Sequence, residues 1–234
     1  MSYVELHAHS AYSFLDGASQ PEELAAQAAG LGYEALALTD HDGVYGSLEF
    51  AHAAKHLGVR PITGAEVTLG DGSHVTLLVE NASGYANLCR LLTAAHAHTR
   101  DTANREPLPP RLDQPLLEEL NAGLACLSGC ARDGLALRDP NAVARLARAF
   151  GPERFYVELQ RPYERGDARR NAHLRDLAAS LGVRTVATVC TFSVSASSRS
   201  VALRRVSPRS YGRCSSTKKR SRPNARASSA AAFG

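Results

Sequence analysis

The feature that most constrains the fold of this chain is an alternation of short β-rich runs with helical runs, which continues from Tyr3 to about Thr188. Strands and helices that take turns over such a length predict a mainly parallel sheet covered by helices. Such a sheet is either open and doubly wound or closed into a barrel. Because polar residues recur at the carboxyl ends of the predicted strands, and barrels carry their chemistry at that rim, we favour the barrel.

The individual elements follow from apolar periodicity and from the residues that begin and end helices. We predict strands over residues 3–9, 35–39, 60–69, 74–80, 124–128, 155–160 and 184–188. We predict helices over residues 19–31, 47–57, 84–97, 142–150 and 168–181, a further helix that begins at residues 116–120, and a proline-rich loop over residues 100–115. Ser19 and Glu22 have the spacing of a capping box, and Gly32 lies just beyond the end of the same helix.

The alternating pattern stops at Val189. Residues 189–234 hold twelve serines and ten basic side chains, with no Asp or Glu and no sustained apolar periodicity. Such a segment buries too little apolar surface to offset the entropy of ordering it. We therefore expect a folded α/β domain over residues 1–188 and a disordered, basic Ser/Arg-rich tail over residues 189–234.

This tail also dominates the charge of the chain. The formal charge is +4 overall, but residues 1–188 contain 17 basic and 23 acidic side chains, a net charge of −6. The basic isoelectric point is therefore no evidence that the domain itself binds nucleic acid. The five cysteines have no CxxC spacing, and no apolar run approaches the length of a bilayer span, so we expect a reduced, cytoplasmic chain that does not enter a membrane.

A histidine pair near the amino terminus is the first candidate for chemistry. His7 and His9 lie at i and i+2 of a predicted strand, so their imidazoles leave the same face and can share a metal ion. An isolated pair of this kind is more often two solvent-facing histidines. Three further strands, however, end at His41, Glu66 and Cys130, and in a parallel barrel those ends converge on one rim. We therefore expect these five side chains to meet in space.

The donor types indicate which metals would bind. Imidazoles mixed with carboxylates suit Zn, Mn or Fe, whereas Mg prefers oxygen donors. Clustered divalent ions lower the pKa of a bound water and hold the oxygens of a phosphoryl group, so hydrolysis of a phosphoester follows most directly. His52 and His56 also have a spacing that can bind a metal, but we expect them on a solvated helix face.

Five segments of the chain carry a resemblance to a known family. They are ELHAHSAYSFLDG at 5–17, ALTDHDGVYG at 37–46, PITGAEV at 61–67, HVTLLVENASGYANLCRL at 74–91 and LSGC at 127–130. In this order they resemble the motifs of the polymerase and histidinol phosphatase (PHP) family, and more narrowly the amino-terminal PHP domain of bacterial DNA polymerase III alpha subunits and their error-prone paralogues. The resemblance implies a distorted seven-stranded β/α barrel with two or three divalent metal ions at one rim.

The resemblance also implies a set of metal ligands. This set is His7, His9, Asp16, His41, Glu66, His74 and Cys130. Three members have alternatives: Asp16 can cap a turn, His74 can be a surface residue at a strand end, and Cys130 can be a small buried hydrophobe. Glu66 is expected to bridge metals and Asp40 to orient a neighbouring imidazole. The nucleophile would be metal-bound water, with no separate catalytic side chain.

One part of the family pattern is missing. After a strand like VRTVAT, polymerase-type PHP domains continue with an N-D-x-H-like segment that supplies the last Asp and His ligands. Here Thr188 is followed by the residues VCTFS, so both of these ligands are absent. The change to Ser and Arg at the same place suggests the hypothesis that the reading frame shifts near Val189. The alternative is a native basic tail that holds nucleic acid weakly through its phosphates.

Taken together, these features predict a truncated PHP domain of a DNA polymerase III alpha-type protein in DNA replication or repair. We expect metal-dependent phosphoester hydrolysis at a DNA 3′ end, as in a 3′–5′ exonuclease, weakened by the loss of the last two ligands. The alternative is a non-catalytic module that supports a polymerase or docks an exonuclease, and a small-molecule phosphatase like histidinol phosphatase is third. The expected partners are the DNA 3′ end, polymerase domains and replication subunits, and nucleotidyl transfer would belong to the parent polymerase.

Overall fold

The computed structural model describes residues 3–99 and 108–189, and the predicted tail from residue 190 onward lies outside this part of the chain. Its strands are β1 (Glu5–Ala8), β2 (Ala35–Leu38), β3 (Arg60–Thr68), β4 (His74–Val79), β5 (Leu124–Leu127), β6 (Phe155–Gln160) and β7 (Arg184–Thr188). Its helices are α1 (Pro21–Gly30), α2 (Ser47–His56), α3 (Ala82–His96), α4 (Gln114–Glu119), α5 (Leu135–Arg138), α6 (Pro140–Phe150) and α7 (Asp167–Leu181). Every predicted strand and helix is present, and the short helix α5 was not predicted.

The seven strands form one sheet whose spatial order is the order of the chain, from β1 to β7. Neighbouring strands pair in parallel except at β4, which runs antiparallel to both β3 and β5. The turn at residues 69–73 is too short for a crossover helix, so β3 and β4 form a hairpin. The amino end of β4 therefore lies at the edge of the sheet where the other strands have their carboxyl ends.

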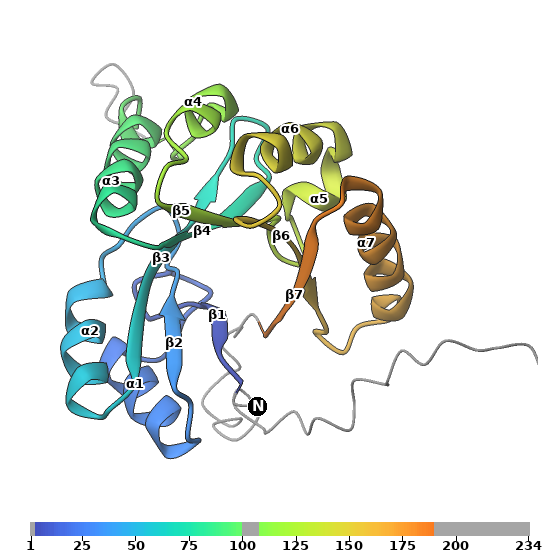
Figure 1. Ribbon diagram of the computed structural model, residues 1–234. Helices are drawn as coiled ribbons and strands as arrows, with labels where there is room; N and C mark the ends of the chain where they lie inside the picture. The colour runs from blue at the N-terminus through green and yellow to red at the C-terminus, as the bar shows by residue number, and fades with distance from the viewer. Residues whose placement is uncertain (1–2, 100–107, 190–234) are drawn as a thin grey trace, which may run out of the picture. The chain divides into compact units, whose positions relative to one another are not determined.

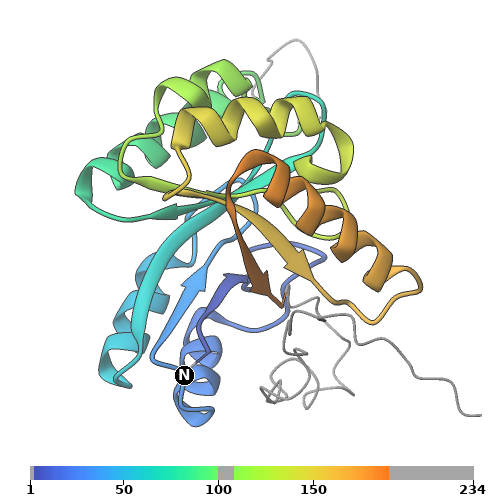
Figure 2. The ribbon, with the colours of Figure 1, turned by 45° about the vertical axis from the view of Figure 1, so that its right-hand side comes forward.

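The sheet curls, with the helices on its outer side (Figures 1 and 2). Its first and last strands, β1 and β7, approach each other, and no backbone ladder joins them within the described residues. The Glu5 side chain, on β1, spans this seam instead, because its Oε2 accepts a hydrogen bond from the backbone N–H of Val189, just after β7, at 2.9 Å. The expectation of a distorted seven-stranded β/α barrel is confirmed, and the barrel is open at the β1–β7 seam.

Apolar side chains fill the space between the sheet and its outer helices. One core cluster joins β3–β6 to α3, α4, α6 and α7 and includes Leu88, Leu146 and Phe155, and a second joins β1 and β2 to α1 and α2 around Leu38 and Phe50. Burial of this apolar surface is the main favourable term in folding. None of the described helices is both long and apolar enough to cross a membrane.

The start of α1 differs by two residues from the prediction. The helix begins at Pro21, with Gln20 as the residue before its first turn, and the Glu23 carboxylate accepts a hydrogen bond from the Gln20 N–H at 3.1 Å. The predicted pairing of Ser19 with Glu22 is therefore wrong. Proline has the backbone angle required at the first helical position, and its lack of an N–H costs nothing there, so the helix starts at Pro21.

Two glycines on helices provide a test of this packing. A Cβ on Gly84, in the first turn of α3, would lie 1.8 Å from the carbonyl oxygen of Gly123, whereas a Cβ on Gly30, at the end of α1, meets no atom within 4 Å. We predict that Gly84→Ala lowers the free energy of unfolding by about 1–3 kcal/mol because the backbone must move. Gly30→Ala should leave it unchanged or raise it by up to about 1 kcal/mol. Urea denaturation measures both, and equal effects of the two substitutions would contradict the packing described.

Candidate metal centre

The carboxyl rim of the sheet gathers all of the predicted metal ligands. His7 lies on β1 and His9 just after it, His41 follows β2, and Glu66 lies on β3. His74 reaches the same rim from the opposite direction, because it is the first residue of the antiparallel strand β4. The remaining two members are Asp16, in the loop after β1, and Cys130, after β5.

These side chains form three overlapping groups of possible metal ligands. Within each group one donor atom of every residue lies within 4.8 Å of the others. The groups are His7, His9 and Glu66; His9, Asp16 and His41; and Glu66, His74 and Cys130. His9 and Glu66 each belong to two groups, so the three potential positions are neighbours that share ligands.

Glu66 lies at the centre of the cluster, and only 3% of its surface is exposed. Its Oε2 is 2.8 Å from His7 Nε2, 3.4 Å from His74 Nε2 and 3.8 Å from His9 Nε2. Its Oε1 is 2.8 Å from His41 Nδ1. One buried carboxylate thus faces four imidazoles, which is the arrangement expected of a carboxylate that bridges cations.

The outer side of the cluster is formed by His41 and Asp16, both of which are partly exposed. His41 Nε2 is 2.7 Å from Asp16 Oδ2, while its other nitrogen contacts Glu66. His41 therefore connects the buried carboxylate of Glu66 with the partly exposed carboxylate of Asp16. On the other side, the Cys130 N–H donates to His74 Nε2 at 3.2 Å, which fixes this imidazole against the strand end of β5.

Burial and neighbouring charges set the protonation of the cluster. Burial favours neutral Glu66, but the hydrogen bonds from His41 and His7 and the charges of His7 and His74 outweigh it and hold the Glu66 pKa well below its usual value. Burial, and then the charge of His7, lowers the pKa of His9 to about 3, so this imidazole is neutral and able to bind a metal.

His41 and Cys130 hold protons that a cation would displace. Burial alone would lower the His41 pKa, but the carboxylates of Glu66 and Asp16 raise it to about 9. Burial, followed by the negative charge of Glu66, raises the pKa of the Cys130 thiol. Binding of a cation to either side chain is therefore coupled to release of a proton.

A further carboxylate behind the cluster was missed by the sequence predictions. Glu158, on β6, is buried, and its Oε1 accepts a hydrogen bond from His7 Nδ1–H at 2.7 Å and another from Gln160 Nε2 at 2.8 Å. The Thr188 hydroxyl at the end of β7 donates to the same oxygen. The sequence contains a pattern that could have predicted this position. Glu158 and Gln160 alternate with the apolar Val157 and Leu159, as residues on the inner face of a sheet do.

The role expected for Asp40 is corrected by the structure. Its carboxylate accepts hydrogen bonds from the Ser10 N–H at 2.7 Å and from the Ser13 hydroxyl at 2.7 Å, and the Ser10 hydroxyl donates to it as well. It does not orient an imidazole directly. Asp40 instead anchors the loop after β1, and Ser13 Oγ in turn accepts the His41 N–H at 3.1 Å.

The donor set fits divalent cations such as Zn, Mn or Fe. Imidazole nitrogens, carboxylate oxygens and one sulfur converge in a buried space, which is the mixture that these ions prefer over Mg. Among the described residues, His9 Nδ1 is a buried nitrogen without a hydrogen-bond partner. Because an unpaired buried polar atom costs free energy, a cation near this imidazole would relieve an existing penalty.

Comparison with curated proteins finds DNA polymerases. The error-prone DNA polymerase of Symbiobacterium thermophilum is 42% identical over 205 residues, which cover 80% of this chain and 19% of that protein. The error-prone DNA polymerase of Mycobacterium tuberculosis strain H37Rv is 44% identical over 207 residues, covering 80% and 18%, respectively. The DNA polymerase III alpha subunit of Treponema pallidum is 34% identical over 210 residues, covering 80% and 17%. The chain thus spans about a fifth of the length of these relatives.

Solved structures with the same fold have low sequence identity. A protein from Bifidobacterium adolescentis assigned as a metal-dependent phosphoesterase superposes with a TM-score of 0.57 at 16% identity, covering 80% of this chain and 86% of that one. An amidohydrolase from Chromobacterium violaceum, with bound sulfate and no metal, has a TM-score of 0.53 at 19% identity, covering 79% and 86%. These likenesses concern the fold. Residues 5–162 match the model of the PHP domain. This match includes most of the described chain and every residue of the metal-ligand cluster, and the chain therefore belongs to the PHP domain family.

Proposed function

We propose that this chain is a metal-dependent phosphoesterase that hydrolyses the terminal phosphodiester at a DNA 3′ end. The observation that carries the proposal is the set of three overlapping donor groups that share His9 and Glu66. Divalent ions held there would supply an activated water and would stabilise charge on the phosphoryl oxygens. We propose that about two or three ions of Zn, Mn or Fe bind.

The protein's own contribution is to orient the ligands before any cation arrives. Glu158 accepts a hydrogen bond from His7 Nδ1–H, so one proton of this imidazole is held on Nδ1, and Nε2, which lies 2.8 Å from Glu66 Oε2, is the nitrogen that a cation would bind on release of its own proton. A carboxylate in this position fixes both the ring orientation and the tautomer, and it makes the ligand more basic. Since Glu158 is itself held by Gln160 and Thr188, β6 and β7 together support a ligand on β1.

The choice of DNA as the substrate rests on the relatives, which are named as DNA polymerases. A phosphoesterase attached to a polymerase meets the 3′ end of the growing strand, and removal of its last nucleotide is proofreading. The proposed partners are therefore the DNA 3′ end, polymerase domains and replication subunits. Polymerisation is proposed only for a complete parent protein.

We further propose that the activity of this chain is weak. At the end of β7 the described residues offer the Thr188 hydroxyl, which donates to Glu158, and the Val189 N–H, which donates to Glu5. Neither group is a metal ligand of the missing Asp or His type. This observation also favours a second candidate function, a non-catalytic module that supports a polymerase or docks a separate exonuclease.

Measurements of metal content and of DNA hydrolysis distinguish the phosphoesterase from the non-catalytic module, and a substitution of His9 tests the metal centre. We predict that the purified chain binds about two or three equivalents of Zn, Mn or Fe and shortens 5′-labelled single-stranded DNA from its 3′ end. His9→Ala removes a ligand shared by two groups, so it should lose at least one equivalent and most of the hydrolysis. His52→Ala, on an exposed face of α2, is the matched control and should change neither.

Element-resolved mass spectrometry and gel analysis of the DNA products measure both quantities. A folded chain without metal would support the structural module. Hydrolysis of histidinol phosphate or nucleotides without hydrolysis of DNA would instead support a small-molecule phosphatase.

The role of Glu158 can be tested without turnover. We predict that Glu158→Gln weakens metal binding by about 10- to 100-fold, because the neutral amide is a poorer acceptor for His7 Nδ1–H. Competition with a chelator measures the affinity, and ¹⁵N NMR of the imidazole reports the tautomer of His7. Glu49→Gln, at an exposed position of α2, is the control. An unchanged affinity together with an unchanged tautomer would show that Glu158 does not position His7.

Restoration of the missing segment tests the explanation for weak activity. The triple variant V189N/C190D/F192H places an N-D-x-H segment directly after Thr188. We expect it to raise the metal stoichiometry and the rate of DNA hydrolysis, whereas V189N/C190A/F192A, which lacks the two ligands, should raise neither. Equal behaviour of the two triple variants would count against the missing ligands as the cause.

A further inference from the structure

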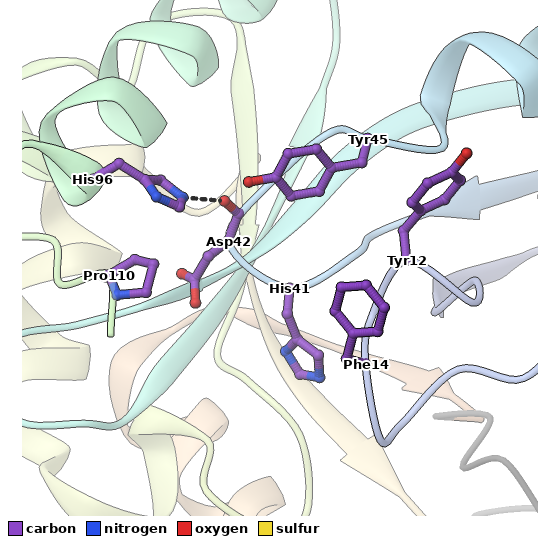
Figure 3. Close-up of a pocket in the computed structure, with 7 residues that line it drawn as sticks. All are labelled: Tyr12, Phe14, His41, Asp42, Tyr45, His96 and Pro110. Atoms are coloured by element: carbon purple, nitrogen blue, oxygen red, sulfur yellow. Dashed lines mark hydrogen bonds between the residues drawn. The ribbon is translucent and has the colours of Figure 1, made fainter. Parts of the chain in front are cut away.

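A cleft of about 470 Å³ opens beside the metal-ligand cluster, and His41 belongs to both. Three aromatic side chains line it: Tyr12, Phe14 and Tyr45, which are 39%, 85% and 58% exposed. In Figure 3, Tyr12 and Phe14 lie on one side of His41, and His96 lies on the other. Single exposed aromatics are ordinary on a protein surface, but three that line one cleft are typical of a binding site.

The aromatic side chains are carried by segments that the structure holds in place. Tyr12 and Phe14 belong to the loop after β1, which is anchored by the hydrogen bonds from Ser10 and Ser13 to the buried carboxylate of Asp40. The same loop supplies Asp16 to the metal-ligand cluster. The cleft and the cluster therefore have a fixed relation to each other.

The opposite side of the cleft carries the polar groups of Asp42 and His96 beside Pro110. The Asp42 carboxylate accepts hydrogen bonds from the Thr68 N–H and hydroxyl, both at 2.8 Å, and the Asp42 carbonyl oxygen is 2.7 Å from His96 Nε2. A carboxylate in the lining disfavours a phosphate in this space. A neutral planar group with hydrogen-bonding edges is compatible with both the aromatic rings and the polar side.

The charge of the domain favours the same kind of ligand. Residues 1–188 carry a formal charge of −6, so they provide little general attraction for a polyanionic DNA backbone. Stacking of bases on aromatic rings does not depend on the net charge of the protein, and every base can stack in this way. With a phosphate at the metal centre, the base of the adjoining nucleotide would lie in the cleft next to it.

We propose that this aromatic cleft binds the unpaired base of the terminal nucleotide, while its phosphodiester lies at the metal centre. The inference rests on the proposed function and names its substrate more narrowly. A base that enters the cleft must leave its partner strand, and this step costs least when the base is mismatched or already single-stranded. The cleft therefore selects frayed 3′ ends over paired ones.

The test compares two single-stranded oligonucleotides that differ only at the 3′ end, one with a terminal thymidine and one with a terminal abasic residue. Both carry a 5′ fluorescein and a phosphorothioate at the terminal linkage, which slows hydrolysis, and binding to the full, metal-loaded chain is measured by fluorescence anisotropy. We expect the base-ended strand to bind about tenfold more tightly. The comparison cancels any binding through basic side chains elsewhere in the chain.

Variants locate this preference in the cleft. Phe14→Ala and Tyr45→Ala should each reduce the preference for the base-ended strand, whereas Tyr45→Phe, which keeps the ring, should retain it. Tyr85→Ala is the matched control, because Tyr85 is 48% exposed on α3 and does not line the cleft. Circular dichroism of each variant confirms that it is folded.

Failure of this inference is distinguishable from failure of the proposed function. Equal binding of the two strands, or a preference that persists in both alanine variants, overturns the cleft as a base site even where Mn²⁺-dependent hydrolysis is observed. If the cleft instead docks a protein segment, the base-ended and abasic strands should bind equally, and that result would overturn the cleft as a base site. A base preference located in the cleft without hydrolysis would support the inference and count against the proposed enzyme.

Discussion

The Glu66 carboxylate is buried at the meeting point of four imidazoles, and the arrangement of the whole rim depends on how this charge is compensated. Removal of a charge from water is costly unless partners of opposite charge and hydrogen-bond donors replace the solvent. Here the partners come from β1, β2 and β4, so the strands must stay in their register for the charge to be tolerated. The same convergence of donors is the basis of the proposed cation site.

The reversed direction of β4 matters for this convergence. In a sheet with only parallel strands, the first residue of a strand lies at the far edge from the chemistry. Because β4 follows β3 in a hairpin, its first residue, His74, lies beside Glu66 instead. A local feature, the short turn at residues 69–73, thereby brings His74, a candidate ligand, to a rim from which a crossover helix would have removed it.

Much of this arrangement could be predicted from the amino-acid sequence. The strands were recognisable because each is a short apolar run with turn residues around it, and the ligands because imidazole, carboxylate and thiol groups follow those runs. The predicted ligands all lie in one cluster. Periodicity does not report strand direction, however, so the antiparallel pairing of β4 was not predicted.

Other features depend on three-dimensional neighbours. Glu158 contacts His7 only because β6 and β1 face each other across the curled sheet, and nothing in the local pattern of β6 specifies that partner. The cleft combines Tyr12 and Tyr45 from two loops, which no short motif records. The start of α1 at Pro21 shows a third limit, because two overlapping capping signals compete and the backbone preference of proline decides between them.

The open seam between β1 and β7 has a consequence for biosynthesis. A ribosome releases β1 first, but the groups that brace it, Glu158 on β6 and the Val189 N–H after β7, leave the exit tunnel only after most of the domain has emerged. Domains generally fold as units, and contacts between distant parts of a chain form slowly. A nascent chain that stops short of β6 carries His7 without the carboxylate that orients it, so this imidazole is not held in place until most of the domain has been synthesised.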